Sequence, residues 1–123
     1  MNDSRAKALV VEDDATTRTL LAGLLESIDC DVDVAADGED ALVQLQSRPY
    51  DVVLLDIVLP SMSGIDVMES LRRDRPNALG CVIVVTGLDI REIRTLFPTV
   101  HETLSKPVIP NRLRQAVRSC LRR

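Results

Sequence analysis

Val52-Val53-Leu54-Leu55-Asp56 is the stretch that decides the fold, because four apolar residues run directly into a carboxylate. Turn-forming residues flank it, with Pro49 before and Pro60 and Gly64 after. A short apolar run between such signals is typical of a strand buried on both faces of a parallel sheet. Asp56 would then lie at the carboxyl end of the strand, which is the edge where open parallel sheets bind ligands. An isolated Asp in this place more often only begins a turn, so the rest of the chain has to decide.

Four other segments also have strand character. One alternates polar and apolar residues, which predicts a strand with one wet face near a sheet edge. Two are apolar runs, and the last is a weak strand candidate near the C-terminus. These segments are Asp31-Val32-Asp33-Val34, Ala8-Leu9-Val10-Val11, Cys81-Val82-Ile83-Val84-Val85 and Thr103-Leu104-Ser105.

Apolar residues between the strands recur at helical spacing, which predicts five helices. The predicted inward-facing residues are Leu20, Leu21, Leu24, Leu25 and Ile28, then Ala41, Leu42 and Leu45, then Ile65, Met68 and Leu71, and finally Leu113, Val117 and Leu121. The fourth helix runs from roughly Ile90 to Phe97 and must end before Pro98. The predicted caps are Asp14 or Thr16 for the first helix, with capping boxes at Ser63/Asp66 and Asp89/Glu92.

Strict alternation of strands and helices implies right-handed crossovers and a parallel sheet covered on both faces. We therefore predict one α/β domain over residues 1–123: a doubly wound, flavodoxin-like five-stranded sheet. The order 2-1-3-4-5 comes from this fold class and places the first and third strands side by side.

The composition excludes several classes of protein. Apolar residues make up 46% and charged residues 28%, which indicates a globular chain. A net charge of −4 and 2% aromatics disfavour direct binding of nucleic acid. Three scattered cysteines and one histidine give no zinc pattern and suggest free thiols in a reducing cytosol. No apolar run is long enough to span a membrane, so we expect a cytoplasmic protein without membrane insertion.

Polar residues follow four of the predicted strands and would meet at one edge of the sheet. They are Glu12, Asp13, Asp56, Thr86 and Lys106. Crowded carboxylates repel one another unless a cation neutralises them, and Mg²⁺ suits oxygen ligands that also leave room for a phosphoryl oxygen. A hydroxyl and an ammonium group beside them suit the oxygens of a phosphoryl group carried on Asp56.

The chain resembles the receiver domain of two-component response regulators over essentially its whole length. The motifs that carry the resemblance are Leu9-Val10-Val11-Glu12-Asp13-Asp14, Ala36-Asp37-Gly38-Glu39-Asp40-Ala41-Leu42, Asp51-Val52-Val53-Leu54-Leu55-Asp56, Leu59-Pro60-Ser61-Met62-Ser63-Gly64, Val84-Val85-Thr86-Gly87 and Ser105-Lys106-Pro107. Each motif is weak by itself, but their order and spacing together are specific.

The resemblance implies a role for each site residue. Asp56 would be the phosphoacceptor, while Glu12, Asp13, Asp56 and the backbone carbonyl of Val58 would hold Mg²⁺. Thr86 and Lys106 would contact the phosphoryl group, and the bond before Pro107 would be cis.

The resemblance also implies partners. A histidine kinase or a histidine phosphotransfer protein would donate the phosphoryl group, and a downstream protein would read the switch. Such a domain is a switch and not a turnover enzyme. The kinase, the target and the oligomeric state stay open.

Two departures from the family's pattern lead to further expectations. The positions that influence self-dephosphorylation hold the apolar residues Val58 and Leu88, which predicts a long-lived phosphoryl group. The usual aromatic residue three places before the lysine is Thr103 here. We therefore predict an output face in which Phe97 is the apolar contact that changes between states, or else simply packs in the core.

Several alternatives remain at this stage. Each site residue taken alone has a common structural explanation. The acidic run could be a solvated turn, Thr86 a strand end and Lys106 a surface lysine. The chain could keep the fold only as a scaffold, although the five-residue site argues against that. A hydrolase or a nucleotide-binding enzyme is disfavoured because GxGxxG and GK[ST] loops and an Asp-x-Asp motif are missing. The chain could also be a receiver cut from a longer protein.

Overall fold

The computed structural model describes residues 5–122, so residues 1–4 and 123 of the predicted domain lie outside it. Five parallel strands form one sheet in the order β2-β1-β3-β4-β5, as predicted. The strands are β1 (Ala6–Val11), β2 (Cys30–Ala35), β3 (Val52–Leu55), β4 (Val82–Thr86) and β5 (Glu102–Ser105). Because β3 sits at the centre of this sheet, the stretch before Asp56 is buried on both sides.

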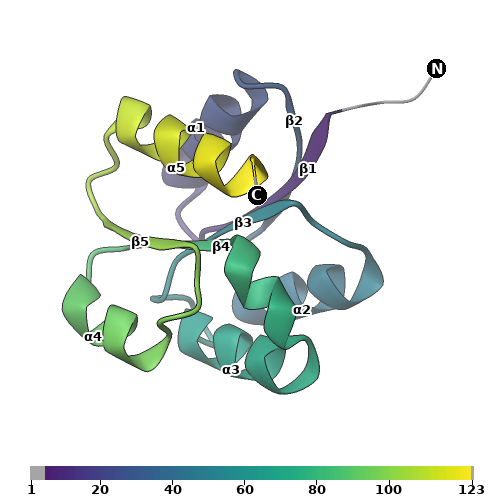
Figure 1. The fold of residues 1–123 in the computed structure, drawn as a ribbon, viewed down its shortest axis with the longest axis vertical. Coiled ribbons are helices and arrows are strands. Elements are labelled where there is room, and N and C mark those ends of the chain that lie inside the picture. The colour runs from purple at the N-terminus through teal and green to yellow at the C-terminus, as the bar shows by residue number, and fades with distance from the viewer. Residues whose placement is uncertain (1–4, 123) are drawn as a thin grey trace.

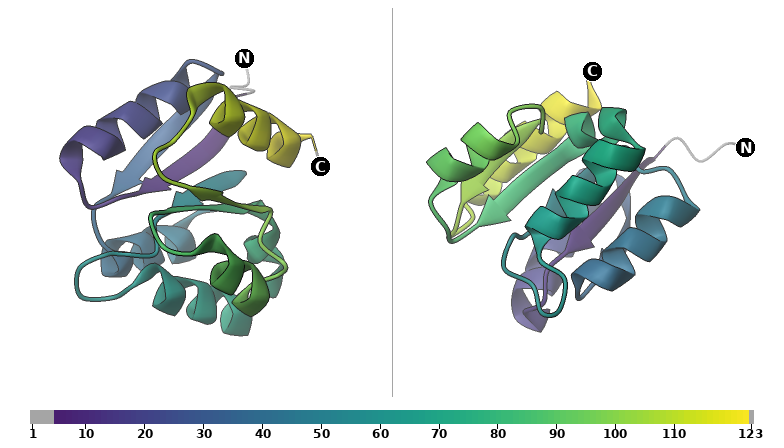
Figure 2. Two further views of the ribbon diagram at one scale, coloured as in Figure 1. Left: turned by 90° about the vertical axis from the view of Figure 1, so that its left-hand side faces the viewer. Right: turned by 90° about the horizontal axis from the view of Figure 1, so that it is seen from below.

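Helices cover both faces of the sheet (Figures 1 and 2). Helices α1 (Ala15–Glu26) and α5 (Pro110–Leu121) lie on one face. The other face carries α2 (Gly38–Ser47), α3 (Gly64–Asp74) and α4 (Ile90–Leu96). A short 3₁₀ helix, η1 (Pro76–Cys81), follows α3 and was not predicted; it moves the start of β4 to Val82.

Alternate residues of the central strands face the two helical layers, which gives two apolar cores. Leu9, Val53 and Val84 pack with α2, α3 and α4. Val10, Leu54 and Val85 pack with α1 and α5. Because both faces of the inner strands are buried, unbroken apolar runs, and not alternating ones, mark these strands in the sequence.

One prediction of an inward-facing side chain is wrong. Leu20 is 64% exposed, because the buried stripe of α1 runs along Leu21 and Leu25 and leaves Leu20 at its side. Ile65 is half-buried and packs against the core, as predicted, and Val67, which the helical pattern did not single out, is buried with Met68.

The helix caps follow the sequence with one difference. Asp14 caps α1 by accepting from the Thr17 amide at 2.9 Å, and Ser63 and Asp66 form the predicted capping box of α3. Asp89 caps α4 through the Arg91 amide at 2.9 Å, so the cap closes one residue earlier than a box with Glu92 requires.

The only tyrosine lies at the β2 edge, before β3 begins. Its hydroxyl donates to Asp33 at 2.6 Å. Burial and this hydrogen bond raise the pKa of Tyr50. Tyr50 therefore stays protonated and ties the loop before β3 to the edge strand.

Candidate functional site

The five predicted site residues come together at the carboxyl edge of the sheet. Glu12 and Asp13 follow β1, Asp56 follows β3, Thr86 ends β4 and Lys106 follows β5. Glu12, Asp56 and Thr86 are buried, whereas Asp13 is exposed. A cluster with one open side can hold a polar group that arrives from solvent.

Backbone hydrogen bonds between neighbouring segments fix these positions. The Asp56 amide donates to Val11 at 3.1 Å, and the Lys106 amide donates to Thr86 at 2.8 Å. Gly64 also packs against the site, because a Cβ there would lie 2.3 Å from the Asp56 carbonyl oxygen. A larger residue at Gly64 would therefore push the segment that carries Asp56 out of place.

Lys106 bridges two of the three carboxylates. Its Nζ lies 2.7 Å from Glu12 Oε1 and 2.8 Å from Asp56 Oδ2. Burial lowers the pKa of Lys106, but the hydrogen bonds and charges of Asp56 and Glu12 together outweigh it and raise the pKa. The ammonium group is therefore charged at neutral pH.

Burial raises the pKa of Glu12, although hydrogen bonds from Lys106 and from the Asp14 amide oppose this shift. The cost of desolvating this carboxylate is thus only partly offset by its neighbours. A site with such a residual cost favours the arrival of a further cation.

The acidic residues have the composition of a site for a hard divalent ion. Glu12, Asp13 and Asp56 each offer a carboxylate oxygen, and these oxygens lie within 4.8 Å of one another. Three oxygen ligands with one exposed member fit Mg²⁺, which keeps several waters when it binds protein carboxylates. The amide of Val58 donates to Asp56 Oδ1 at 3.1 Å, so the Val58 peptide adjoins the cluster.

The remaining predicted residues lie around this cluster. The Thr86 hydroxyl accepts from the Leu88 amide at 3.2 Å, and the Lys106–Pro107 bond is cis, as predicted. Val58 and Leu88 are 58% and 47% exposed, so both present apolar surface next to the site.

The two residues predicted for the output face are both buried here. Phe97 is 1% exposed and packs in the core beneath α4, with the Arg72 guanidinium 4.7 Å from its ring centroid. Thr103 is 2% exposed, and its hydroxyl has no hydrogen-bond partner among the described residues. Neither residue forms an exposed surface in this structure, and their roles in switching stay predictions.

Arg18 is a site residue that sequence reasoning missed. It reaches back from α1 and donates through Nη1 to the carbonyls of Glu12 at 2.9 Å and Asp13 at 3.2 Å. The contact fixes the loop that carries both acidic residues. An arginine one turn into a helix gives no sequence signal for such a backbone contact.

Comparisons with known proteins show the family and the fold of the chain. Residues 8–118 match the family model of the response regulator receiver domain. The chain belongs to that family. This receiver domain is therefore a two-component signalling module.

Two curated relatives are similar over nearly the whole chain. PhoP of Bacillus subtilis, a transcriptional regulatory protein of alkaline phosphatase synthesis, is 32% identical over 95% of this receiver domain and 49% of its own length. The DNA-binding response regulator MtrA of Mycobacterium tuberculosis is 35% identical over 100% of it and 54% of its own length. The chain thus spans about half the length of these relatives.

Solved receiver structures share the fold closely. The receiver domain of a Francisella response regulator is 28% identical, with a TM-score of 0.86 over 96% of this chain and 98% of its own. The response regulator TrrA of Thermotoga maritima, solved in complex with Mg²⁺ and BeF, is 29% identical, with a TM-score of 0.84 over 94% and 99% of the two chains.

Proposed function

We propose that Asp56 is the phosphoacceptor of this receiver domain and that Lys106, Thr86, Glu12 and Asp13 serve the transfer. The observation that carries the proposal is the bridge from Lys106 Nζ to Glu12 and Asp56, at 2.7 and 2.8 Å, beside the exposed carboxylate of Asp13. A buried carboxylate held by a charged lysine at an open edge is placed to act as a nucleophile.

In the proposed transfer, an Asp56 carboxylate oxygen attacks the phosphorus of a phosphohistidine. The new P–O bond forms as the P–N bond breaks, and the electron pair of that bond leaves with the imidazole, which takes a proton from water. Lys106 stays protonated. Its ammonium group contacts the Asp56 carboxylate before the transfer and the phosphoryl oxygens after it. Thr86 offers its hydroxyl to the same oxygens from the end of β4.

Mg²⁺ fits the donor set of Glu12, Asp13, Asp56 and the Val58 carbonyl, and when bound it would neutralise charge on the transferring phosphoryl group. The chain's own part is to hold these oxygens together before the ion arrives. Arg18 contributes by fixing the Glu12 and Asp13 carbonyls.

We further propose that residues 1–123 act as one cytoplasmic receiver unit that switches and does not turn over substrate. The donor would be a histidine kinase or a histidine phosphotransfer protein, and a downstream protein would read the switched state. Among the described residues, no helix is long and apolar enough to cross a membrane.

Acetyl phosphate with Mg²⁺, read by intact mass, tests the proposal. The wild type should gain one phosphoryl group, and Asp56→Asn should gain none. Asp51→Asn is the matched control, because Asp51 lies before the same strand and binds the Lys7 amide instead. Equal labelling of Asp56→Asn and wild type would disprove the assignment.

A further inference from the structure

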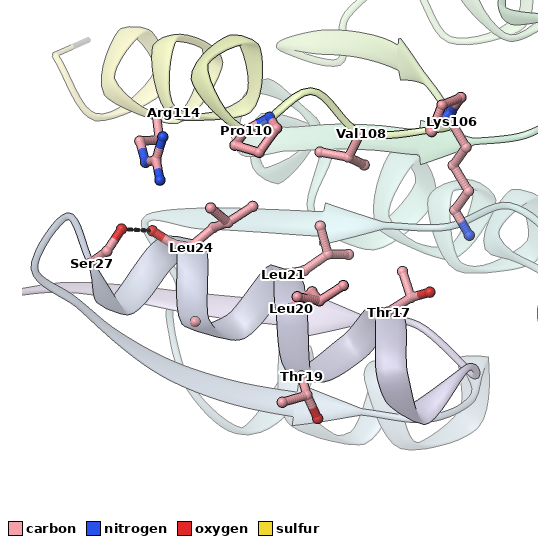
Figure 3. Close-up of a pocket in the computed structure, with 12 residues that line it drawn as sticks. Thr17, Thr19, Leu20, Leu21, Leu24, Ser27, Lys106, Val108, Pro110 and Arg114 are labelled. Carbon is pink, nitrogen blue, oxygen red and sulfur yellow. Dashed lines mark hydrogen bonds between the residues drawn. The ribbon is translucent and has the colours of Figure 1, made fainter.

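Arg18 is the side chain through which α1 holds the loop after β1. Its Nη1 donates to the Glu12 carbonyl at 2.9 Å and to the Asp13 carbonyl at 3.2 Å. The side chain is half-buried and lies one turn into α1. Figure 3 shows Thr17, its neighbour in this turn, at the end of α1 towards which the Lys106 side chain points. The contact thus reaches the site from a helix that supplies no group to the proposed transfer.

Asp13 depends on this contact more than Glu12 does. Both carboxylate oxygens of Glu12 are bound, one by Lys106 at 2.7 Å and the other by the Asp14 amide at 3.0 Å. The Asp13 carboxylate is exposed. Among the described residues, the only hydrogen bond that Asp13 makes is the one that its carbonyl accepts from Arg18. The backbone that Arg18 holds therefore sets the position of the Asp13 carboxylate.

The other bonds from this turn of α1 reach Asp14 and not Asp13. Thr17 donates to Asp14 Oδ2 from its amide at 2.9 Å and from its hydroxyl at 2.7 Å. The Arg18 amide donates to the Asp14 carbonyl at 2.8 Å. Loss of the Arg18 side chain would leave this helix cap intact and would release only the carbonyls of Glu12 and Asp13.

Charge and position predict opposite effects of Arg18 on a dication at the acidic cluster. A guanidinium group repels a cation, so its charge alone would weaken binding. A fixed loop holds the ligands in place before the ion arrives, and groups that orient metal ligands typically change metal affinity by roughly 10–100-fold. Arg18 contacts the loop next to the exposed Asp13, where water weakens the repulsion, so we expect position to prevail.

We propose that Arg18 is a positioning residue for Mg²⁺, which holds the Asp13 carboxylate in place and so raises the affinity of the acidic cluster for the ion. The inference rests on the proposed function, because it takes Glu12, Asp13 and Asp56 as the metal site. In this role Arg18 contacts neither the ion nor the phosphoryl group. The transfer step itself should therefore not need Arg18 once the ion is bound.

Titration of the full chain with Mg²⁺, followed by amide NMR shifts, tests the proposal. Arg18→Met keeps an unbranched apolar stem and removes both the donors and the charge, and its dissociation constant for Mg²⁺ should rise roughly tenfold. Arg18→Lys should recover part of the affinity, because an ammonium group can donate to the same carbonyls. Arg73→Met is the matched control and should bind like the wild type, since Arg73 pairs with Asp74 on α3.

Labelling by acetyl phosphate separates metal affinity from the transfer step. At low Mg²⁺, Arg18→Met should gain the phosphoryl group about tenfold more slowly than the wild type, and saturating Mg²⁺ should restore the wild-type rate. In EDTA its amide spectrum should match the wild type outside residues 11–18, which shows that the fold is intact.

Unchanged or tighter binding of Mg²⁺ by Arg18→Met would overturn the proposal, because charge would then cancel or outweigh position. A lower rate that persists at saturating Mg²⁺ would also overturn it, since Arg18 would then act on the transfer itself. Asp13→Asn distinguishes these results from a failure of the proposed function. If Asp13→Asn also binds Mg²⁺ like the wild type, the ion does not bind at the acidic cluster, and both assignments fail.

Discussion

We expect the lifetime of a phosphoryl group on Asp56 to depend on two side chains at the open side of the site. Val58 and Leu88 are apolar and largely exposed, and neither can orient a water molecule by hydrogen bonding. The double variant Val58→Asn with Leu88→Glu should speed loss of phosphate roughly tenfold, below the 10²–10⁴ that a positioned acid or base contributes. Decay of phosphorylated protein after removal of acetyl phosphate measures the rate.

Val43→Asn is the control for that variant, because Val43 is equally exposed but lies on α2. An unchanged or slower decay in the double variant would refute the role assigned to these two positions.

Glu12 makes the stability of the metal-free protein depend on pH. Its pKa is raised by burial above the ordinary value of 4.5. The folded state therefore holds this proton more tightly than the unfolded state. The stability linked to Glu12 is fully present below pH 4.5 and is lost as the pH rises through the pKa of the folded state. The free energy of unfolding of wild type minus that of Glu12→Gln should fall over this window.

Urea unfolding in EDTA at several pH values between acid and neutral measures this difference. Glu26→Gln, an exposed site at the end of α1, is the control and should show no such trend. A difference that grows with pH would mean that Lys106 stabilises the Glu12 carboxylate by more than burial destabilises it.

At the scale of elements, α4 is the part of the fold best suited to switching. It has seven residues, which is too short for a helix that is stable without tertiary contacts. Ile93 and Phe97 anchor it in the core. Arg72 of α3 holds its end by donating to the Leu96 carbonyl at 3.2 Å and by stacking on Phe97.

We expect that Mg²⁺ with beryllofluoride, a phosphoryl mimic, changes hydrogen exchange mainly in residues 88–103. Lys106→Ala should reduce this change, because the link from the modified Asp56 to the segment after β5 is lost. The contrary result is identical exchange in residues 88–103 while another face responds.

At the scale of the whole molecule, a bound metal should stabilise the folded state by mass action. At a Mg²⁺ concentration 100 times its dissociation constant, the free energy of unfolding should rise by about 2.7 kcal/mol. EDTA should reverse the gain, and Asp13→Asn should remove most of it. Urea unfolding with and without Mg²⁺ measures the effect.

Asp74→Asn, at the exposed end of α3, should keep the full stabilisation by Mg²⁺. If Asp13→Asn keeps it as well, the metal does not bind at the acidic cluster.

Much of this architecture could be read from the sequence, because strand ends and caps are local features. The apolar runs before Glu12, Asp56 and Thr86 predict the inner strands, and parallel pairing then brings their ends together. What the sequence could not show depends on distant packing. Leu20 fits the helical pattern of its neighbours, yet it lies beside the buried stripe of α1 and is exposed.

The contacts within the site were also beyond sequence reasoning. That Lys106 reaches Glu12 as well as Asp56 depends on side-chain length and on the distance between β1 and β5, which have β3 and β4 between them. Arg18 was missed because its partners are backbone carbonyls, which every residue has.

The position of Tyr50 has an optical consequence. The chain has no tryptophan, and its single tyrosine precedes β3 whereas Asp56 follows it, six residues and about 20 Å along an extended strand. We therefore expect its fluorescence to respond to changes at the β2 edge more than to events at the acidic cluster. Because the chain has no indole of its own, a tryptophan introduced near Leu88 would give a fluorescence signal next to the acidic cluster.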